Sequence, residues 1–455
     1  MRSSRVVDKK RSGSSRSAST VPQGPEIELR IAELAHGGDG VAIVEEKGQR
    51  RAVFVRGGAP GDRVRAKVDF SSRPARAHLV EILEPGASRV VPPCPYVGRC
   101  GGCDWMHIAR ISQPSFHTSI VRAGLPESLR ETPITSHPSP LGGRTRARLH
   151  VHADRRGVEV GFYEARSHAL VAIEHCLALH PALDVARGRI AALFEGSKGD
   201  AEVEIALGAL DDDDTLRKPV MDISWRGELP ATFFARMDAA VKKGEWQGAR
   251  VLVGDSKIPA TIGDATPWIR AGDGAPLKLA PGGFAQASEA GNIALSQRVD
   301  ELARAALGRS RGDANVVELY AGAGNFTVLL ARSAARIIAV ESNAAACSAA
   351  QENLRARSLA ARVVNADAST YATPDRTQLV VLDPPRTGAR EACETIVTAR
   401  VREVVYVSCD PATLGRDLAI LDRGGYVVAS IETFEMFPDS SHVETVVALA
   451  RRGKS

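Results

Sequence analysis

The sequence predicts an α/β protein in which a doubly wound parallel sheet occupies the C-terminal part and a small β-barrel precedes it. From about residue 290, apolar strand-like runs alternate with helical segments, and such alternation implies parallel strands joined by crossover helices. Residues 26–83 instead consist of short period-two runs separated by glycine turns, which predicts the barrel. A chain of 455 residues is long enough for roughly two to four domains.

The excess of positive charge lies in the N-terminal tail. Residues 1–20 carry six basic side chains and one acidic side chain, which accounts for the whole formal net charge of +5. We predict that residues 1–25 form a disordered basic tail, because so polar a segment cannot bury enough apolar surface to fold alone. The tail can bind a phosphate backbone or remain only a solvated terminus, and the sequence leaves both interpretations open.

Composition places the chain among ordinary globular proteins, with 44% hydrophobic and 25% charged residues. No stretch approaches the roughly 20 apolar residues of a membrane span, and the basic N-terminus lacks the apolar core of a secretory signal. We therefore expect a cytoplasmic monomer that has no membrane partner. The seven cysteines are an odd number, which in this setting argues against a disulfide framework.

Residues 26–84 are predicted to form a small OB-like barrel. Runs at 27–31 and 63–68 alternate with period two, and glycine turns at 37–40 and 57–62 separate the strands. Barrels of this type bind oligonucleotides through basic surfaces, so we favour RNA binding over the alternative of a merely solvated charged face. The basic side chains concerned are Arg50, Arg51, Arg56, Arg63, Arg65, Lys67, Arg73 and Arg76.

Residues 85–278 are predicted to form a central α+β domain that carries a metal site. Strand-like runs at 147–152 and 157–162 and a helical stretch at 181–194 indicate its mixed structure. Three cysteines follow the pattern C-x5-C-G-G-C, whose two glycines permit a tight wrap around a bound group. This spacing allows either zinc or an iron–sulfur cluster. The predicted ligands are Cys94, Cys100, Cys103 and, as the best fourth, Cys176.

The C-terminal part is predicted to alternate helices and strands. In a parallel sheet the carboxyl ends of the strands gather at one edge, where ligands bind. Helices are predicted over 292–306 and 326–332, and strands over 316–319, 337–340, 361–364, 379–382, 404–407, 426–431 and 443–449.

A glycine loop after the first of these strands predicts a nucleoside cofactor. Gly322 and Gly324 let the backbone approach a ligand at a helix start. Thr327 stands where the dinucleotide fingerprint has its third glycine, which weakens the case for NAD. Glu341 ends the next strand, 19 residues after Gly322, where an acid can bind ribose hydroxyls. A plain tight turn is the alternative interpretation of the loop.

Cys409 is the candidate nucleophile. It stands at a predicted strand end on the cofactor side of the sheet, whereas Cys347 and Cys393 lie in helical patterns typical of packing residues. A thiol needs an electropositive setting to react as a thiolate. Asp383 follows another strand, and the two prolines after it stiffen the exit of the chain. Glu444, close to the final strand, is a candidate proton acceptor.

In combination, these residues resemble the RNA (uracil-5-)-methyltransferase family, whose members make 5-methyluridine in ribosomal and transfer RNA. The resemblance runs from about residue 26 to the end, and its barrel is similar to a TRAM domain. It implies a Rossmann-like class I methyltransferase domain over residues 279–455, with S-adenosylmethionine as cofactor. The motifs that carry it are C-x5-C-G-G-C, Phe284-Ala285-Gln286, E-L-Y-x-G-x-G-N-F, D-P-P-R and S-C-D-P-x-T-L, in the family's order.

The resemblance also implies roles for single residues. Cys409 would be the nucleophile that adds to uracil C6, and Glu444 the base that removes the C5 proton. The four cysteines would hold a [4Fe–4S] cluster, and the choice of iron–sulfur over zinc rests on the resemblance. The family often has a histidine where this chain has Asp439. Contacts with S-adenosylmethionine are implied for Gln286, Tyr320, Asn325, Glu341, Asp367 and Asp383.

The cysteine motif resembles the 23S ribosomal-RNA branch of the family more than the classical bacterial transfer-RNA branch, which lacks it. We therefore expect ribosomal RNA as the partner and substrate, with transfer RNA as the alternative. Two other functions remain open. An amino-group methyltransferase needs the cofactor loop but no thiol, and a non-catalytic RNA-binding protein needs neither.

Overall fold

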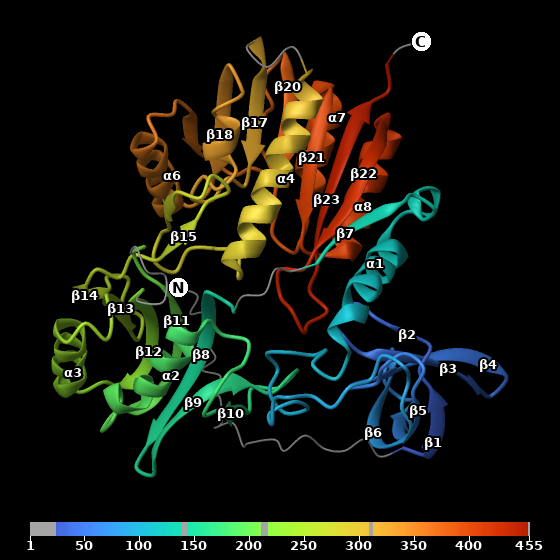
Figure 1. Cartoon of the computed structure of the whole chain (residues 1–455), viewed down its shortest axis with the longest axis vertical. Helices are drawn as coiled ribbons and strands as arrows, with labels where there is room; N and C mark the ends of the chain where they lie inside the picture. Colours follow the sequence, from blue (N-terminus) through green and yellow to red (C-terminus); the bar gives the residue numbers. More distant parts are fainter. Residues whose placement is uncertain (1–23, 139–142, 211–216, 309–312, 454–455) are drawn as a thin grey trace, which may run out of the picture.

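The computed structural model describes residues 24–138, 143–210, 217–308 and 313–453. Nearly all of the predicted basic tail lies outside these residues. Figure 1 shows three sheet-containing regions, with the barrel at the N-terminal end, a second sheet in the middle of the chain and a large α/β sheet at the C-terminal end. No helix within the described ranges is long and apolar enough to cross a membrane.

The N-terminal strands curl around a small apolar core, as their period-two pattern predicts. In β5, Val64, Ala66 and Val68 are fully buried, whereas the intervening Arg63 and Arg65 reach the solvent. The strands pair in the order β1-β5-β6-β4-β3-β2. Their bounds are β1 (Glu26–Arg30), β2 (Glu33–Leu34), β3 (Gly40–Glu46), β4 (Gln49–Val55), β5 (Arg63–Asp69) and β6 (Ala75–Glu84).

A second sheet, covered by two helices, carries the middle of the chain. Phe194, Trp225 and Phe233 pack against one another in the core between this sheet and α2 and α3. The strand order is β10-β9-β8-β11-β12-β13-β14. The elements are β8 (Arg146–Asp154), β9 (Gly157–Tyr163), β10 (Leu170–Ala172), α2 (Pro181–Leu193), β11 (Lys198–Leu207), β12 (Pro219–Glu228), α3 (Ala231–Lys242), β13 (Gly248–Val253) and β14 (Ala260–Gly263), followed by a separate pair, β15 (Trp268–Arg270) and β16 (Pro276–Lys278).

An 8-stranded sheet with helices on both faces forms the C-terminal part, in the order β19-β18-β17-β20-β21-β23-β22-β7. Val380 and Leu382 contact the core beneath α7 and α8, whereas Leu379 and Val381 contact the core beneath α4. This confirms the doubly wound class (Figure 1). The strands are β7 (Ile134–His137), β17 (Asn315–Leu319), β18 (Arg336–Glu341), β19 (Arg362–Asn365), β20 (Thr377–Leu382), β21 (Glu403–Ser408), β22 (Tyr426–Phe434) and β23 (Glu444–Arg451). The helices are α1 (Gln113–Gly124), α4 (Glu289–Leu307), α5 (Thr327–Leu330), α6 (Ala344–Ala356), α7 (Arg390–Ala399) and α8 (Pro411–Arg423), with 3-10 turns η1 (Arg110–Ser112) and η2 (Glu127–Leu129).

Two features of this sheet differ from the prediction. β23 runs antiparallel to both β21 and β22, because the loop that joins β22 to β23 leaves no room for a crossover helix. In addition, β7 and α1 come from the predicted central domain but belong with this sheet. β7 forms its edge, where Ile134 pairs with Ile431 of β22, and Val121 of α1 packs in the core beneath α8. Residues 113–124 and 134–137, which lie before the predicted boundary at residue 279, therefore pack with the C-terminal sheet.

Candidate active site

The predicted nucleophile and base meet at one edge of the C-terminal sheet. Asp383 follows β20 and Cys409 follows β21, so both lie beyond the carboxyl ends of parallel strands. β23 runs the other way and starts at this edge with Glu444. Ser408 of β21 pairs with Thr445 of β23. Cys409 and Glu444 directly adjoin this last pair, and they lie close enough for the charge of Glu444 to raise the pKa of the Cys409 thiol.

The acids at this edge lie in a poorly solvated setting. Burial, and then the charge of Asp383, raise the pKa of Glu444. Its Oε2 has no hydrogen-bond partner among the described residues. Burial, and then Glu444 and Asp383, raise the pKa of the Cys409 thiol to about 12. Arg386 opposes the shifts of both Cys409 and Glu444, because a nearby positive charge favours the ionised form of each group.

The glycine loop between β17 and α5 reaches the same edge. Tyr320 and Gly322 have φ angles of 63° and 56°, a left-handed conformation that glycine adopts without strain. The Gly322 N–H donates to Glu341 Oε2 at 3.0 Å, and the Asn343 N–H donates to Glu341 Oε1 at 2.7 Å. The predicted ribose-binding acid therefore ties the loop to the end of β18. Its two oxygens still have lone pairs for a ligand.

The other predicted cofactor residues lie in varied settings. The Asn325 amide donates to Asn292 Oδ1 at 2.7 Å and to Ser296 Oγ at 3.0 Å, so it holds the glycine loop against α4. Asp367 is exposed, and its Oδ1 accepts from the N–H and hydroxyl of Ser369 at 2.9 and 2.8 Å. Gln286 is buried in the segment before α4, with 5% of its surface exposed.

The four predicted metal ligands line one small cavity in the middle of the chain. Cys94, Cys100 and Cys103 come from the segment before α1, and Cys176 comes from the loop before α2. Burial, and then the nearby Cys176 and Cys94, raise the pKa of Cys100. A Cβ at Gly101 would lie 2.9 Å from the Tyr163 carbonyl oxygen, which explains the glycine in the motif. Among the described residues, however, no group of three or more possible ligands could hold a single metal ion.

Cys409, Glu444 and Asp383 mark one edge of the C-terminal sheet, which we call the catalytic edge. The structure brings further residues, which we did not predict, to this edge. His36, from the barrel loop between β2 and β3, has its Nε2 3.3 Å from Oδ2 of Asp410, the residue after Cys409. Asp104, next to Cys103, contacts the segment that leads to Glu444 through Ser441. No local pattern marks His36 or Asp104, because only the fold joins such distant parts of the chain. Arg386 differs from these two residues, because the D-P-P-R motif already places it beside Asp383 at a strand exit in the sequence.

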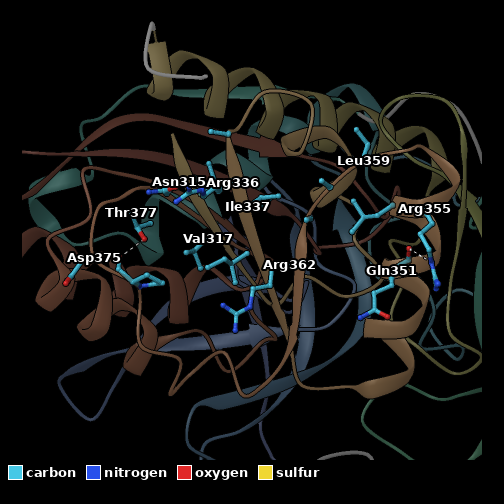
Figure 2. A pocket seen from close by; sticks show the side chains of 17 residues that line it. Asn315, Val317, Arg336, Ile337, Gln351, Arg355, Leu359, Arg362, Asp375 and Thr377 are labelled. Atoms are coloured by element: carbon cyan, nitrogen blue, oxygen red, sulfur yellow. Dashed lines mark hydrogen bonds between the residues drawn. The ribbon is translucent and has the colours of Figure 1, made fainter. Parts of the chain in front are cut away.

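A sizeable cavity lies elsewhere, and none of the predicted site residues lines it. It measures about 750 Å³ and lies where β17, β18 and β20 begin, opposite the catalytic edge. Figure 2 shows Asn315 beside Arg336 at one end, and Gln351 with Arg355 at the other. Chemistry, rather than cavity size, therefore identifies the candidate active site.

Three family models match parts of the chain. Residues 360–452 match the model described as tRNA (uracil-5-)-methyltransferase, residues 297–405 match a methyltransferase small domain, and residues 21–80 match the TRAM domain. The first match contains both Cys409 and Glu444, and the third covers nearly all of the barrel.

Similar proteins extend these matches to nearly the whole chain. A 23S rRNA (uracil(1939)-C(5))-methyltransferase from Halomonas elongata is 33% identical over 93% of this chain and 89% of its own length. An uncharacterized RNA methyltransferase from Caulobacter vibrioides is also 33% identical, over 93% of this chain and 100% of its own. A Pyrococcus abyssi tRNA (uracil-54, C5)-methyltransferase, solved with S-adenosyl-L-homocysteine, shares the fold with a TM-score of 0.72 and 20% identity, over 93% of this chain and 100% of that one.

Proposed function

Because the chain belongs to the RNA (uracil-5-)-methyltransferase family, we propose that it methylates C5 of a uracil base in RNA, with S-adenosylmethionine as methyl donor. The observation that carries the proposal is that Cys409 and Glu444 adjoin the last β21–β23 pair, at the sheet edge that the glycine loop reaches. A nucleophile and a base in one site suit a reaction that must first activate a poor carbon nucleophile and then remove its proton.

The two side chains have successive tasks in this proposal. The Cys409 thiolate adds to C6 of the uracil, and the electron density that moves into the ring makes C5 nucleophilic. Once C5 carries the methyl group, Glu444 accepts the C5 proton. The C–H electron pair then reforms the C5–C6 double bond, the Sγ–C6 bond breaks, and Cys409 leaves as a thiolate. A stacked base must leave its stack to reach this site.

The residues along the edge fit the proposed methyl donor. When bound, S-adenosylmethionine supplies the methyl group and a positive charge to an edge that is rich in acids. Glu341 has free lone pairs for ribose hydroxyls, and Asp383 lies on the same edge as Cys409. The family resemblance assigns the remaining contacts to Gln286, Tyr320, Asn325 and Asp367.

The proposed substrate is large-subunit ribosomal RNA, because the Halomonas elongata relative is named for a uracil of 23S rRNA. Transfer RNA is the alternative, since the Pyrococcus abyssi protein that shares the fold is named for a tRNA uracil. Mapping of 5-methyluridine in total RNA, with and without the gene, separates the two. Loss of a mark from large-subunit rRNA supports the proposal, whereas loss from tRNA alone contradicts it.

RNA that contains 5-fluorouracil tests the covalent reaction, because fluorine at C5 cannot leave as a proton. With S-adenosylmethionine, the wild-type protein should form a complex that survives denaturation, and Cys409→Ala should form none. Cys393→Ala is the matched control, since this buried thiol belongs to α7 and lies outside the site. A complex formed by Cys409→Ala would remove Cys409 as the nucleophile. Methylation without any complex would favour an amino-group methyltransferase, and no binding of S-adenosylmethionine in calorimetry would favour a non-catalytic RNA-binding protein.

We also propose that Cys94, Cys100, Cys103 and Cys176 hold a [4Fe–4S] cluster. Four thiols around one cavity are the donor set that such a cluster needs. Each cysteine of such a cluster binds a different iron atom, so the four thiols need not surround a single ion. Protein purified without oxygen should contain about four iron and four sulfide per chain. One zinc per chain in place of iron would overturn the cluster.

A further inference from the structure

Residues 435–443 join β22 to β23 and end at the proposed base, Glu444; we call them the base loop. Figure 1 shows this loop extending from the C-terminal sheet towards the segment before α1. It contains no helix or strand, so its polar backbone groups need partners from other parts of the chain. Those partners fix the position of the backbone at Glu444 and thus the position of its free carboxylate oxygen.

The segment between Cys103 and the middle of α1 supplies many of these partners. The Trp105 N–H donates to the Asp439 carbonyl oxygen at 2.9 Å. Gln113 forms a pair of bonds with Asp439: its Oε1 accepts from the Asp439 N–H at 3.1 Å, and its Nε2 donates to Asp439 Oδ1 at 3.2 Å. His117 Nε2 lies 2.9 Å from the Ser440 carbonyl oxygen. The middle of the loop is therefore held at Asp439 and Ser440.

Asp104 makes the contact closest in sequence to the base. Its Oδ1 accepts from the Ser441 N–H at 2.8 Å, and its Oδ2 accepts from the Ser441 hydroxyl at 2.6 Å. Ser441 is buried and stands three residues before Glu444. On the other side, a Cβ at Gly38 of the barrel would come within 2.1 Å of Asp104 Oδ2. The Asp104 carboxylate is thus confined between the barrel and the base loop.

The four-cysteine site reaches the same loop by a second route. Arg144 Nη2 lies 3.6 Å from the Cys103 sulfur. The Arg144 guanidinium carbon lies 5.5 Å from the centre of the Phe437 ring, a cation–π distance. Cys103 is also the chain neighbour of Asp104. Both routes link the four cysteines to the base loop, and neither involves the glycine loop or Cys409.

We infer that Asp104 is a positioning residue for Glu444, and that the segment after the cysteine motif supports proton removal rather than the earlier addition and methylation steps. This inference rests on the proposed function, because it assigns Glu444 to the step in which the C5–H bond breaks and the Sγ–C6 bond is lost. A displacement of about 1 Å at a reacting group can cost on the order of 100-fold in rate. Loss of Asp104 should therefore slow release of the methylated RNA and leave formation of the covalent complex unchanged.

A single-turnover experiment on the full chain separates the two steps. RNA with tritium at uracil C5 reports proton removal as released tritium, and labelled methyl groups in a denaturation-resistant complex report the earlier steps. For both Asp104→Ala and Ser441→Ala, we expect complex formation within about twofold of wild type and tritium release slower by about 10- to 100-fold. Asp104→Asn, which keeps an acceptor for the Ser441 N–H, should give a smaller effect. The double variant Asp104→Ala/Ser441→Ala should be no slower than either single variant, since the two residues form one contact.

Asp154→Ala is the matched control. Its Oδ1 also accepts a backbone N–H, that of Arg156 at 2.7 Å, but in the turn between β8 and β9. This variant should release tritium at the wild-type rate. The inference is overturned if Asp104→Ala and Ser441→Ala release tritium as fast as wild type, or if formation and release slow down together. If wild type and Glu444→Gln form no covalent complex at all, the proposed function has failed instead.

Discussion

The outer face of the barrel and the catalytic edge both concentrate charged side chains. On the barrel, exposed charges pair with opposite charges, whereas at the catalytic edge burial favours the neutral form of the acids. On the barrel, Arg63 lies 2.9 Å from Glu28 and 2.7 Å from Glu84, with all three side chains well exposed. At the catalytic edge, Glu444 and Asp383 are acids whose pKa values burial raises. Exposed pairs contribute little to stability or binding, whereas buried groups with shifted pKa values are typical of reactive sites.

This contrast narrows the predicted RNA-binding surface. Of the basic side chains predicted to form it, Arg51, Arg63, Arg65 and Arg76 lie in ion pairs with acids of the barrel. The other four make no ion pair with any residue that the structure describes. We therefore propose that RNA contacts the barrel mainly through these unpaired cations, which are Arg50, Arg56, Lys67 and Arg73.

The largest effect is expected when the acid is removed from the catalytic edge. Glu444→Gln keeps the shape of the side chain but cannot accept a proton, so turnover should fall by about 10²- to 10⁴-fold while the covalent complex with RNA accumulates. Steady-state methylation and gel analysis of denatured complexes measure both. Glu403→Gln, which removes an acid from the opposite end of β21, should leave turnover unchanged. Normal turnover by Glu444→Gln would show that another group removes the proton.

A moderate effect is expected on stability, because a buried acid that ionises destabilises the fold. The pKa of Glu444 is raised in the folded state, so the unfolded chain releases this proton first as the pH rises above about 4.3. The free energy of unfolding of the wild type therefore falls as the pH rises from about 4.3 to the raised pKa of Glu444 in the folded state, and it stops falling above that pKa. Glu444→Gln should unfold at a higher temperature than wild type at about pH 9 and at a similar temperature at about pH 4. Equal melting temperatures at both values would argue against a destabilising charge at this site.

The smallest effects are expected on the barrel. Each unpaired cation that binds a phosphate contributes about one unit to the salt dependence of RNA affinity, so Arg50→Ala should lower that slope. Arg63→Ala should change affinity by less than about twofold, because its charge is already balanced by Glu28 and Glu84. RNA titrations at several salt concentrations measure both. An equal loss of slope in Arg63→Ala would show that its ion pairs give way to RNA.

Local patterns in the sequence predict most helices and strands of this fold. They do not predict features that depend on contacts between distant parts of the chain. The strand predicted over 404–407 is Glu403–Ser408 in the structure, since a buried β-branched run identifies itself. β7 was missed because it is short and pairs with β22, a strand far away in the sequence. The antiparallel direction of β23 was missed as well, although it is what brings Glu444 to the sheet edge where Cys409 lies.

The candidate site divides in the same way. Motif residues such as Cys409 and Asp383 could be found from the sequence, because each follows its own strand. The hydrogen bonds of the Asn325 amide to α4 could not be found in this way, since their acceptors, Asn292 and Ser296, share no motif with Asn325. The same is true of His36 and Asp104, which belong to other parts of the chain.

The pairing of β7 with β22 has a consequence for the order in which the protein assembles during synthesis. Residues 134–137 emerge from the ribosome long before residues 431–434, with which they form the edge of the sheet. Until then β7 lacks its partner strand, and contacts that span so much of the chain form slowly. Asp104 likewise waits for Ser441, 337 residues later. The sheet edge that carries Cys409 and Glu444 can therefore be completed only after β21 and β23 have been made.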